Sequence, residues 1–450
     1  MAEQLYAGFA KLVTNPPMGI NIPGYFKKRY ADGIISDLYL QATAFQCGEQ
    51  KGIIITTDAV AMLDASYKII RDKIVERTGI EPDSIYICCM HSHTSFRVAN
   101  PKSTAQDDYS IFVRKLYQDF ADCAQFAFED LKPVTDVKIA SGIAEDVGFI
   151  RRYRMKDGSC KTNPSTGNPD LVSFEGIQDN SLQLVRVLRE NASEILFVNY
   201  ATHADVIGGT KYCADWPGFT REYLRGALNG NAEVMLIVGC QGDSNHLNRF
   251  MPKGKQLLKL ERSKQMARIL TGETLKIYDD AVSVPHNKIH FAIKTVEVGT
   301  NPFDPADIPE AKEIHALYNE CQDSKDPRFK NYKLSLPDAQ RIIKLLNGPE
   351  AFYLLVSAFQ IGNVAFIGFQ GEPFTEIGLK VKEGSKMSMT ICSCITNGKQ
   401  GYFPTAAAFA EKGYERSISP FAHDVAQKLT DAALELISEM EILSEEIKTN

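Results

Sequence analysis

The sequence lacks several features that would assign a protein to a class at once. Its 450 residues contain no long basic run, and 56 acidic against 50 basic residues give a net charge of −6. A nucleic-acid-binding surface is therefore not expected. No apolar stretch approaches the roughly 20 residues needed to span a bilayer, and the N-terminus lacks the pattern of a signal peptide. We expect a soluble cytoplasmic protein, and the sequence leaves its oligomeric state open.

A cysteine-based metal site is also missing from the sequence. The ten cysteines form no C-x-x-C pair, so a cysteine zinc knuckle is not predicted. Several cysteines lie inside apolar runs, where a free cysteine behaves as a small hydrophobic residue. We therefore interpret them as reduced core residues.

Apolar runs typical of strands alternate with stretches of helical spacing along the chain. This alternation predicts an α/β protein, a single large domain (residues 1–450) with a mixed β-sheet core flanked by helices. The glycine- and proline-rich first forty residues predict an irregular segment, 156–180 an exposed hairpin or loop, and 302–335 a surface insertion. The predicted helices are 59–77, started by Thr57 or Asp58, then 107–131, 217–228, 254–278 and 420–447. The predicted strands are 38–45, 52–57, 84–90, 137–140, 182–188, 194–202, 233–238, 289–298, 352–360, 363–370 and 387–396.

Two histidines follow the predicted strand 84–90 directly. In an extended chain, residues two apart point to the same side, so His91 and His93 are expected to face one space. Taken alone, such a pair is more often structural than metal-binding.

Ligand-capable residues also follow three other predicted strands, namely His203, Glu372 and the turn 397–402. In α/β folds, residues just beyond strand ends gather at one edge and form the usual ligand crevice. Two imidazoles and a carboxylate with an open position make a common catalytic zinc site, which activates water for hydrolysis.

Each of these residues also has a structural explanation. His203 could bond a backbone carbonyl, Glu372 before Pro373 suits the start of a helix, and Tyr402 could be an ordinary buried aromatic residue. The remaining histidines, including His246, match no pattern and are interpreted as structural.

Short motifs in a fixed order resemble the neutral/alkaline non-lysosomal ceramidase family, specifically its N-terminal catalytic domain. The resemblance suggests a distant member without the family's immunoglobulin-like C-terminal domain. The motifs are Pro23-Gly24-Tyr25, His91-Ser92-His93-Thr94, Asn199-Tyr200-Ala201-Thr202-His203, Ala214-Asp215-Trp216-Pro217-Gly218, Gly242-Asp243, Gly371-Glu372-Pro373, Gly401-Tyr402 and Tyr414.

The resemblance implies a zinc-dependent hydrolase of lipid metabolism that cleaves the amide bond of an N-acyl substrate with zinc-activated water. It implies that His91, His203, Glu372 and Tyr402 bind zinc. It places His93, Arg151 and Tyr414 at the substrate, with Arg152 and Arg154 as alternatives for the arginine.

The loop after Gly242-Asp243 departs from the family pattern G-D-x-S-P-N. Asn245 stands in the place of the serine, and the proline is missing. Two alternatives therefore stay open. One is a serine-type esterase using Ser244, although the G-x-S-x-G elbow is absent. The other is a catalytically silent relative that binds a ligand or partner in the same crevice.

Overall fold

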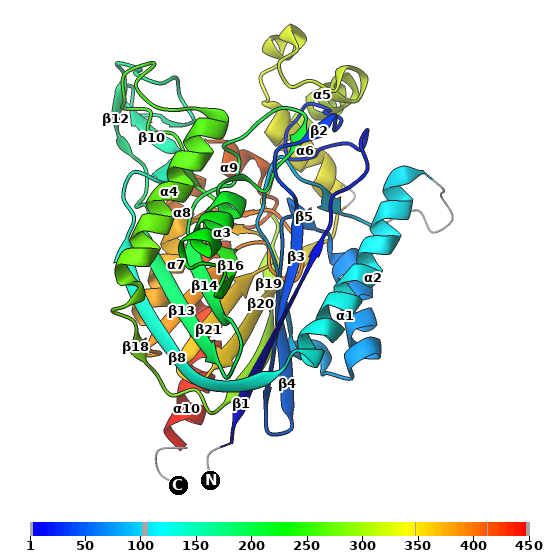
Figure 1. Cartoon of the computed structure of the whole chain (residues 1–450). Helices are drawn as coiled ribbons and strands as arrows, with labels where there is room; N and C mark the ends of the chain where they lie inside the picture. The colour runs from blue at the N-terminus through cyan, green and yellow to red at the C-terminus, as the bar shows by residue number, and fades with distance from the viewer. Residues whose placement is uncertain (1–2, 101–106, 347, 412, 447–450) are drawn as a thin grey trace.

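Two β-sheets form the centre of the computed structural model, which describes residues 3–100, 107–346, 348–411 and 413–446 (Figure 1). The larger sheet has nine strands in these residues. Along it run β16 (Ala232–Val238), β14 (Glu194–Tyr200), β13 (Ser181–Arg189), β8 (Lys132–Ile143), β1 (Leu5–Val13), β3 (Tyr39–Cys47), β4 (Gln50–Thr57) and β6 (Ile85–Cys89), with β18 (Val282–Ser283) beside β8.

The smaller sheet packs against the larger one through a shared apolar core. Its order is β19 (Ile289–Gly299), β20 (Ala351–Ile361), β21 (Val364–Phe369) and β23 (Met389–Ser393). Between the sheets, the rings of Phe45 and Phe359 are 5.9 Å apart, and those of Phe197 and Phe366 are 5.3 Å apart. All four rings are fully buried, which makes this interface the main hydrophobic core.

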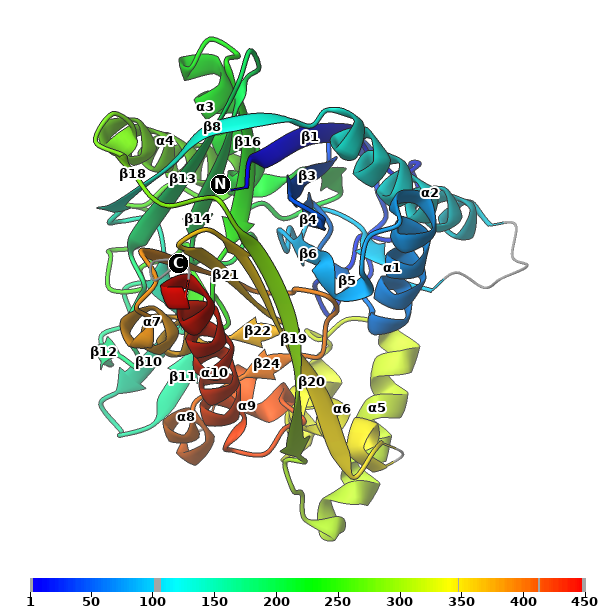
Figure 2. The ribbon, with the colours of Figure 1, turned by 90° about the horizontal axis from the view of Figure 1, so that it is seen from below.

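Helices cover the outer faces of both sheets (Figures 1 and 2). Against the larger sheet lie α2 (Asp108–Glu129), with α1 (Asp64–Thr78) beside it, and α3 (Asp215–Ala227) with α4 (Lys259–Tyr278). Against the smaller sheet lie α7 (Thr375–Gly384) and α10 (Val425–Glu446). The predicted mixed α/β fold is confirmed. Within the described residues, no helix is both long and apolar enough to cross a membrane.

Three pairs of parallel strands explain why ligand-capable residues meet. The pairs β4–β6, β14–β16 and β21–β23 are parallel, and their crossovers contain α1, α3 and α7 respectively. Parallel neighbours end at the same edge of a sheet, where α/β folds usually bind ligands. His91 follows β6, His203 follows β14, and Glu372 follows β21.

Three sequence predictions need correction. Residues 5–13 are not irregular, because Leu5 to Val13 pair along the whole of β3 as an interior strand. The first helix begins at Asp64 and not at 59, because the Asp58 carboxylate is bonded to Arg221 and to the Tyr39 amide. Strand 137–140 is part of a longer β8. The last residue predicted for the C-terminal helix, 447, lies outside the described residues.

A helical unit occupies the region predicted as a surface insertion. It contains η2 (Pro305–Asp307), α5 (Ile308–Cys321), η3 (Pro327–Asn331) and α6 (Leu336–Leu346), with a small apolar cluster of its own. The remaining elements are short: β2 (Gly33–Ile34), β5 (Ala61–Met62), η1 (Pro82–Ser84), β7 (Arg97–Val98), β9 (Phe149–Ile150), β10 (Arg152–Met155), β11 (Cys160–Thr162), β12 (Leu171–Phe174), β15 (Lys211–Tyr212), β17 (Ser244–Asn245), β22 (Glu372–Pro373), β24 (Tyr402–Phe403), α8 (Ala406–Ala410) and α9 (Tyr414–Ile418).

The buried ion pair between α3 and the end of β4 generates a stability prediction. Arg221 lies 2.8 Å from Asp58 and stacks on Tyr39. Arg221→Met leaves the Asp58 carboxylate buried without its cation, so the free energy of unfolding should fall by about 3 kcal/mol. Chemical denaturation measures this. As control, Lys380→Met breaks an exposed pair with Glu376 and should cost less than about 0.5 kcal/mol; equal losses in the two variants would contradict the assignment.

Candidate metal centre

His91 lies in a strained turn immediately beyond β6. Its φ is 59°, a left-handed conformation that non-glycine residues rarely adopt and that is frequent at functional sites. Its Nδ1 lies 2.6 Å from the carbonyl oxygen of Val60. A carbonyl can only accept, so Nδ1 carries the proton and Nε2 presents a lone pair. That Nε2 lies 3.3 Å from Oε2 of Glu372.

His203 reaches the same carboxylate from the other side. Its Nδ1 lies 2.8 Å from the carbonyl oxygen of Gln241 and 2.9 Å from that of Ser244, so its Nε2 also presents a lone pair. Its Nε2 lies 3.2 Å from Oε2 of Glu372. The indole of Trp216 donates to the His203 carbonyl at 3.1 Å and fixes the backbone there. Burial lowers the pKa of His203, which keeps the imidazole neutral at pH 7.

Glu372 completes a convergence of three lone-pair atoms. Burial alone would raise the pKa of its carboxyl, but the ammonium of Lys399, at 3.1 Å from Oε1, holds that pKa well below its ordinary value. Its Oε2 and the His203 Nε2 are both buried without a hydrogen-bond partner in the described residues. Two unprotonated nitrogens and a carboxylate oxygen repel one another unless a proton or a cation lies between them. A metal ion fits this arrangement.

Tyr402 is held opposite Glu372 by backbone pairing. The two residues are partners in the parallel pair β22–β24, and the Glu372 amide donates to Gly401 at 2.8 Å. The phenol ring stacks on the His203 ring with centroids 6.4 Å apart. Burial, followed by the charge of Glu372, raises the pKa of Tyr402 well above its ordinary value.

His93 belongs to the same cluster but differs from the other two histidines. Its Nε2 lies 3.2 Å from the His91 Nε2, and the three histidines have nitrogens within 4.8 Å of one another. Its Nδ1 has no hydrogen-bond partner among the described residues. Gly24, at φ 106°, packs on this ring so closely that a Cβ there would lie 2.8 Å from Nδ1.

Of the three neighbouring arginines, Arg151 lies at the site. Its Nε donates to Glu415 at 2.7 Å and its Nη2 to the Gly242 carbonyl at 2.7 Å. Its guanidinium carbon is 5.4 Å from the centre of the Tyr402 ring and 6.0 Å from that of Tyr414. Arg152 is buried and bonded to Glu415 at 3.2 Å.

The third arginine, Arg154, forms ion pairs with a different set of residues. Arg154 is partly exposed and forms ion pairs with Glu175 at 2.6 Å and Glu411 at 2.8 Å. Neither Arg152 nor Arg154 lines the cavity described next.

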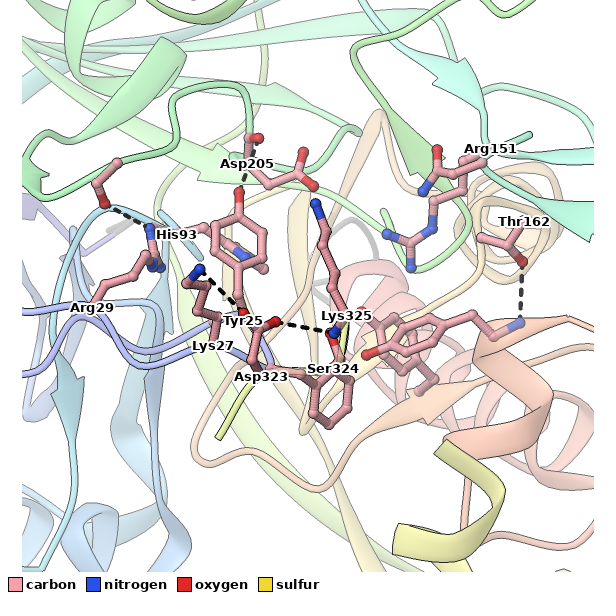
Figure 3. Close-up of a pocket in the computed structure, with 16 residues that line it drawn as sticks. Tyr25, Lys27, Arg29, His93, Arg151, Thr162, Asp205, Asp323, Ser324 and Lys325 are labelled. Carbon is pink, nitrogen blue, oxygen red and sulfur yellow. Dashed lines mark hydrogen bonds and ion pairs between the residues drawn. The ribbon is translucent and has the colours of Figure 1, made fainter. Parts of the chain in front are cut away.

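A cavity of about 640 Å³ opens beside the cluster (Figure 3). That volume is typical of a small-molecule site. His93 and Tyr402 line the cavity and also contact His91 and His203 of the cluster, and Arg151 and Tyr414 lie on its wall. Residues 323–325 of the helical unit also line it, so the region predicted as a surface insertion contributes to the site.

Sequence reasoning missed several charged groups of the site. Asp205 lines the cavity, and the His246 Nδ1 lies 3.3 Å from its Oδ1, although His246 carried only a structural interpretation. Lys399 and Glu415 were also missed. Asp205 could have been predicted, because it follows His203 by two residues in the sequence. The interactions of Lys399 and Glu415 are with residues distant in the sequence, so no local pattern indicates them.

Ser244 lies outside the cavity wall. Its hydroxyl is buried and donates to Gln178 at 2.5 Å, with Thr202 at 3.3 Å as a further neighbour. Among the described residues, no histidine side chain forms a hydrogen bond with this hydroxyl, so it lacks the base that activates a catalytic serine.

Comparisons with known proteins identify the fold. No protein-family model and no curated protein matches the sequence. The structure is similar to the crystal structure of neutral ceramidase from Pseudomonas aeruginosa, with a TM-score of 0.70 and 12% identity over 97% of this chain and 75% of that one. It is also similar to a ceramidase complexed with C2, with a TM-score of 0.69 and 11% identity over 98% of this chain and 75% of that one. The chain has the neutral ceramidase fold, as the sequence motifs had suggested.

Proposed function

We propose that this protein is a zinc-dependent hydrolase that cleaves the amide bond of an N-acyl substrate. The observation that carries the proposal is the convergence of the His91 Nε2, the His203 Nε2 and the Glu372 Oε2 beside a cavity. The neutral ceramidase fold supports the choice of an amide as the bond that is cleaved.

In this proposal, His91, His203 and Glu372 hold the zinc ion, with Tyr402 as the fourth protein ligand. Both histidines direct their Nδ1 proton at a backbone carbonyl, which is the usual way to orient a metal-binding imidazole. His93 lacks such a partner in the described residues, and this supports its assignment to the substrate. Zinc would supply a Lewis acid and lower the pKa of bound water toward ~7.

The other residues act on the substrate carbonyl. Arg151 and Tyr414 are donors on the cavity wall, suited to an oxygen that gains negative charge as the amide carbon becomes tetrahedral. Glu415 fixes the guanidinium of Arg151 through its bond at 2.7 Å. Burial raises the pKa of Tyr414 above its ordinary value, so its phenol keeps the proton that it donates.

Metal analysis and turnover of N-acyl substrates test the ligand set. The wild type should contain one zinc per chain and hydrolyse at least one N-acyl amide. His203→Ala and Glu372→Gln should lower zinc affinity at least about tenfold and abolish turnover, because each removes a ligand. His93→Ala should keep its zinc while kcat falls.

The matched control is His286→Ala, which removes an imidazole whose Nδ1 also lies near a carbonyl, that of Val284 at 3.1 Å. It should change neither zinc content nor turnover. A folded wild type without metal affinity would end the zinc proposal. Stoichiometric zinc without turnover of any N-acyl amide or ester would instead favour the silent relative that binds a ligand or partner.

Tyr414→Phe removes one proposed donor and keeps the ring. We expect kcat to fall about 10²-fold with little change in KM, because the lost hydrogen bond is strongest in the transition state. Steady-state kinetics measures this. The control is Tyr318→Phe. The Tyr318 ring packs on Phe26 but does not line the cavity, so this substitution should leave kcat unchanged. An unchanged kcat in Tyr414→Phe would remove Tyr414 from the mechanism.

Asp243, in the loop beside Arg151, should make the folding stability of the protein depend on pH. Burial raises the pKa of its carboxyl from 3.8 to about 6, although Thr375 donates to it at 2.8 Å. The folded state therefore binds this proton more tightly than the unfolded chain, and the contribution of Asp243 to stability is lost as pH rises from about 4 to about 6. Relative to the wild type, Asp243→Asn should gain stability over that interval and then level off. Denaturation at pH 4 to 8 checks this; a constant difference would contradict it.

A further inference from the structure

The cavity carries a surplus of positive charge after its internal pairs are taken into account. Its lining contains the cations Lys27, Arg29, Arg151 and Lys325 and the carboxylates Asp205 and Asp323. Lys27 pairs with Asp323 at 3.1 Å and Arg151 pairs with Glu415, which leaves Asp205, beside His246, as the lining carboxylate without a lysine or arginine ion pair in the described residues. Arg29 and Lys325 are thus the lining cations without a carboxylate ion pair in the described part of the chain.

These two cations have different surroundings. Arg29 donates to the carbonyls of Pro23 at 2.7 Å and His93 at 2.8 Å, and it stacks on Tyr25. It therefore contributes positive charge to the cavity, while its N–H groups are used in hydrogen bonds to backbone carbonyls of the cavity wall. Lys325 is exposed, and no ion pair or hydrogen bond of its ammonium is found among the described residues. In Figure 3 its side chain extends across the cavity toward Asp205.

A fixed turn presents Lys325 to the cavity. The Ser324 amide donates to the Phe26 carbonyl at 3.1 Å, and Lys27 and Asp323 form both a backbone bridge and an ion pair. The Lys325 amide donates to Oδ1 of Asp323 at 3.0 Å. Because the backbone at Lys325 and at the two residues before it is held in this way, the ammonium is tethered at the cavity while its side chain can change conformation.

Aromatic rings form the rest of the wall near this turn. The Phe26 ring lies edge-on to Tyr414, with centroids 6.4 Å apart, and edge-on to Tyr318 of α5 at 5.9 Å. It thereby connects the turn at 323–325 with the proposed carbonyl donors. A substrate that reaches from Tyr414 to Lys325 would pass along aromatic surface and end at a positive charge.

We propose that the amide substrate carries an anionic group, a carboxylate or a phosphate, and that Lys325 binds this group. The inference rests on the proposed function. The anionic group takes no part in the reaction, in which the amide C–N bond breaks, the water oxygen bonds the acyl carbon and the amine gains a proton. A cation without a partner in a cavity of this size is suited to select such a group by charge.

Paired probes test the charge requirement. N-hexanoylglycine is compared with its neutral primary amide, and N-hexanoyl-O-phosphoethanolamine with N-hexanoylethanolamine. Each is assayed with the zinc-loaded wild type, with Lys325→Met, and with the control Lys330→Met. Lys330 lies on the same helical unit, is exposed and does not line the cavity. Kinetics gives KM and kcat, and calorimetry gives the dissociation constant of every probe that is not hydrolysed.

The wild type should favour the anionic member of at least one pair about tenfold, through KM or the dissociation constant. Lys325→Met should remove that preference and Lys330→Met should retain it; the pair that responds identifies the anion as carboxylate or phosphate. Equal KM values or dissociation constants for the charged and neutral probes with the wild type would overturn the inference, and so would an unchanged preference in Lys325→Met. Neither result would contradict the proposed hydrolysis. A Lys325-dependent preference in binding without any turnover would uphold anion recognition and overturn the hydrolase.

Discussion

The site depends on one electrostatic constraint, the meeting of the His91 and His203 Nε2 atoms at a single oxygen of Glu372. Each histidine is fixed through its other nitrogen, His91 by Val60 and His203 by Gln241, so neither ring can rotate away without losing a buried hydrogen bond. The carboxylate is held in its charged form by Lys399. The folded chain thus keeps a cluster of lone pairs that is unfavourable by itself and favourable around a cation.

The sheet topology provides the position of this cluster, and much of it was visible in the sequence. Apolar runs that end in His91, His203 and Glu372 predicted both the strands and their shared edge, because buried parallel strands are nearly continuous hydrophobic segments. The strand Leu5–Val13 was missed because its burial does not alternate regularly and because the residues that follow it, 16–33, are rich in glycine and proline. The start of α1 was misplaced because Asp58, a good helix cap by type, is used in a tertiary ion pair.

The surroundings of the site were far less predictable. The pairing of Arg151 and Arg152 with Glu415 joins residues more than 260 positions apart, and nothing in the local sequence indicates it. The turn that carries Lys325 belongs to a polar region whose composition is typical of an exposed insertion. Its backbone bonds to Phe26 and Lys27, together with the Lys27–Asp323 ion pair, hold it at the cavity. Local patterns predict elements, whereas distant pairing decides which charges face a ligand.

The parallel pair of Glu372 with Tyr402 has a consequence for the order of events during folding. The proposed ligands are separated in sequence from position 91 to position 402, so no fragment ending before Tyr402 contains the complete set. Contacts of such sequence separation form late, since the loops between them must close first. A metal ion would therefore bind with full affinity only after both sheets have assembled. Metal binding would then follow folding and would not initiate it.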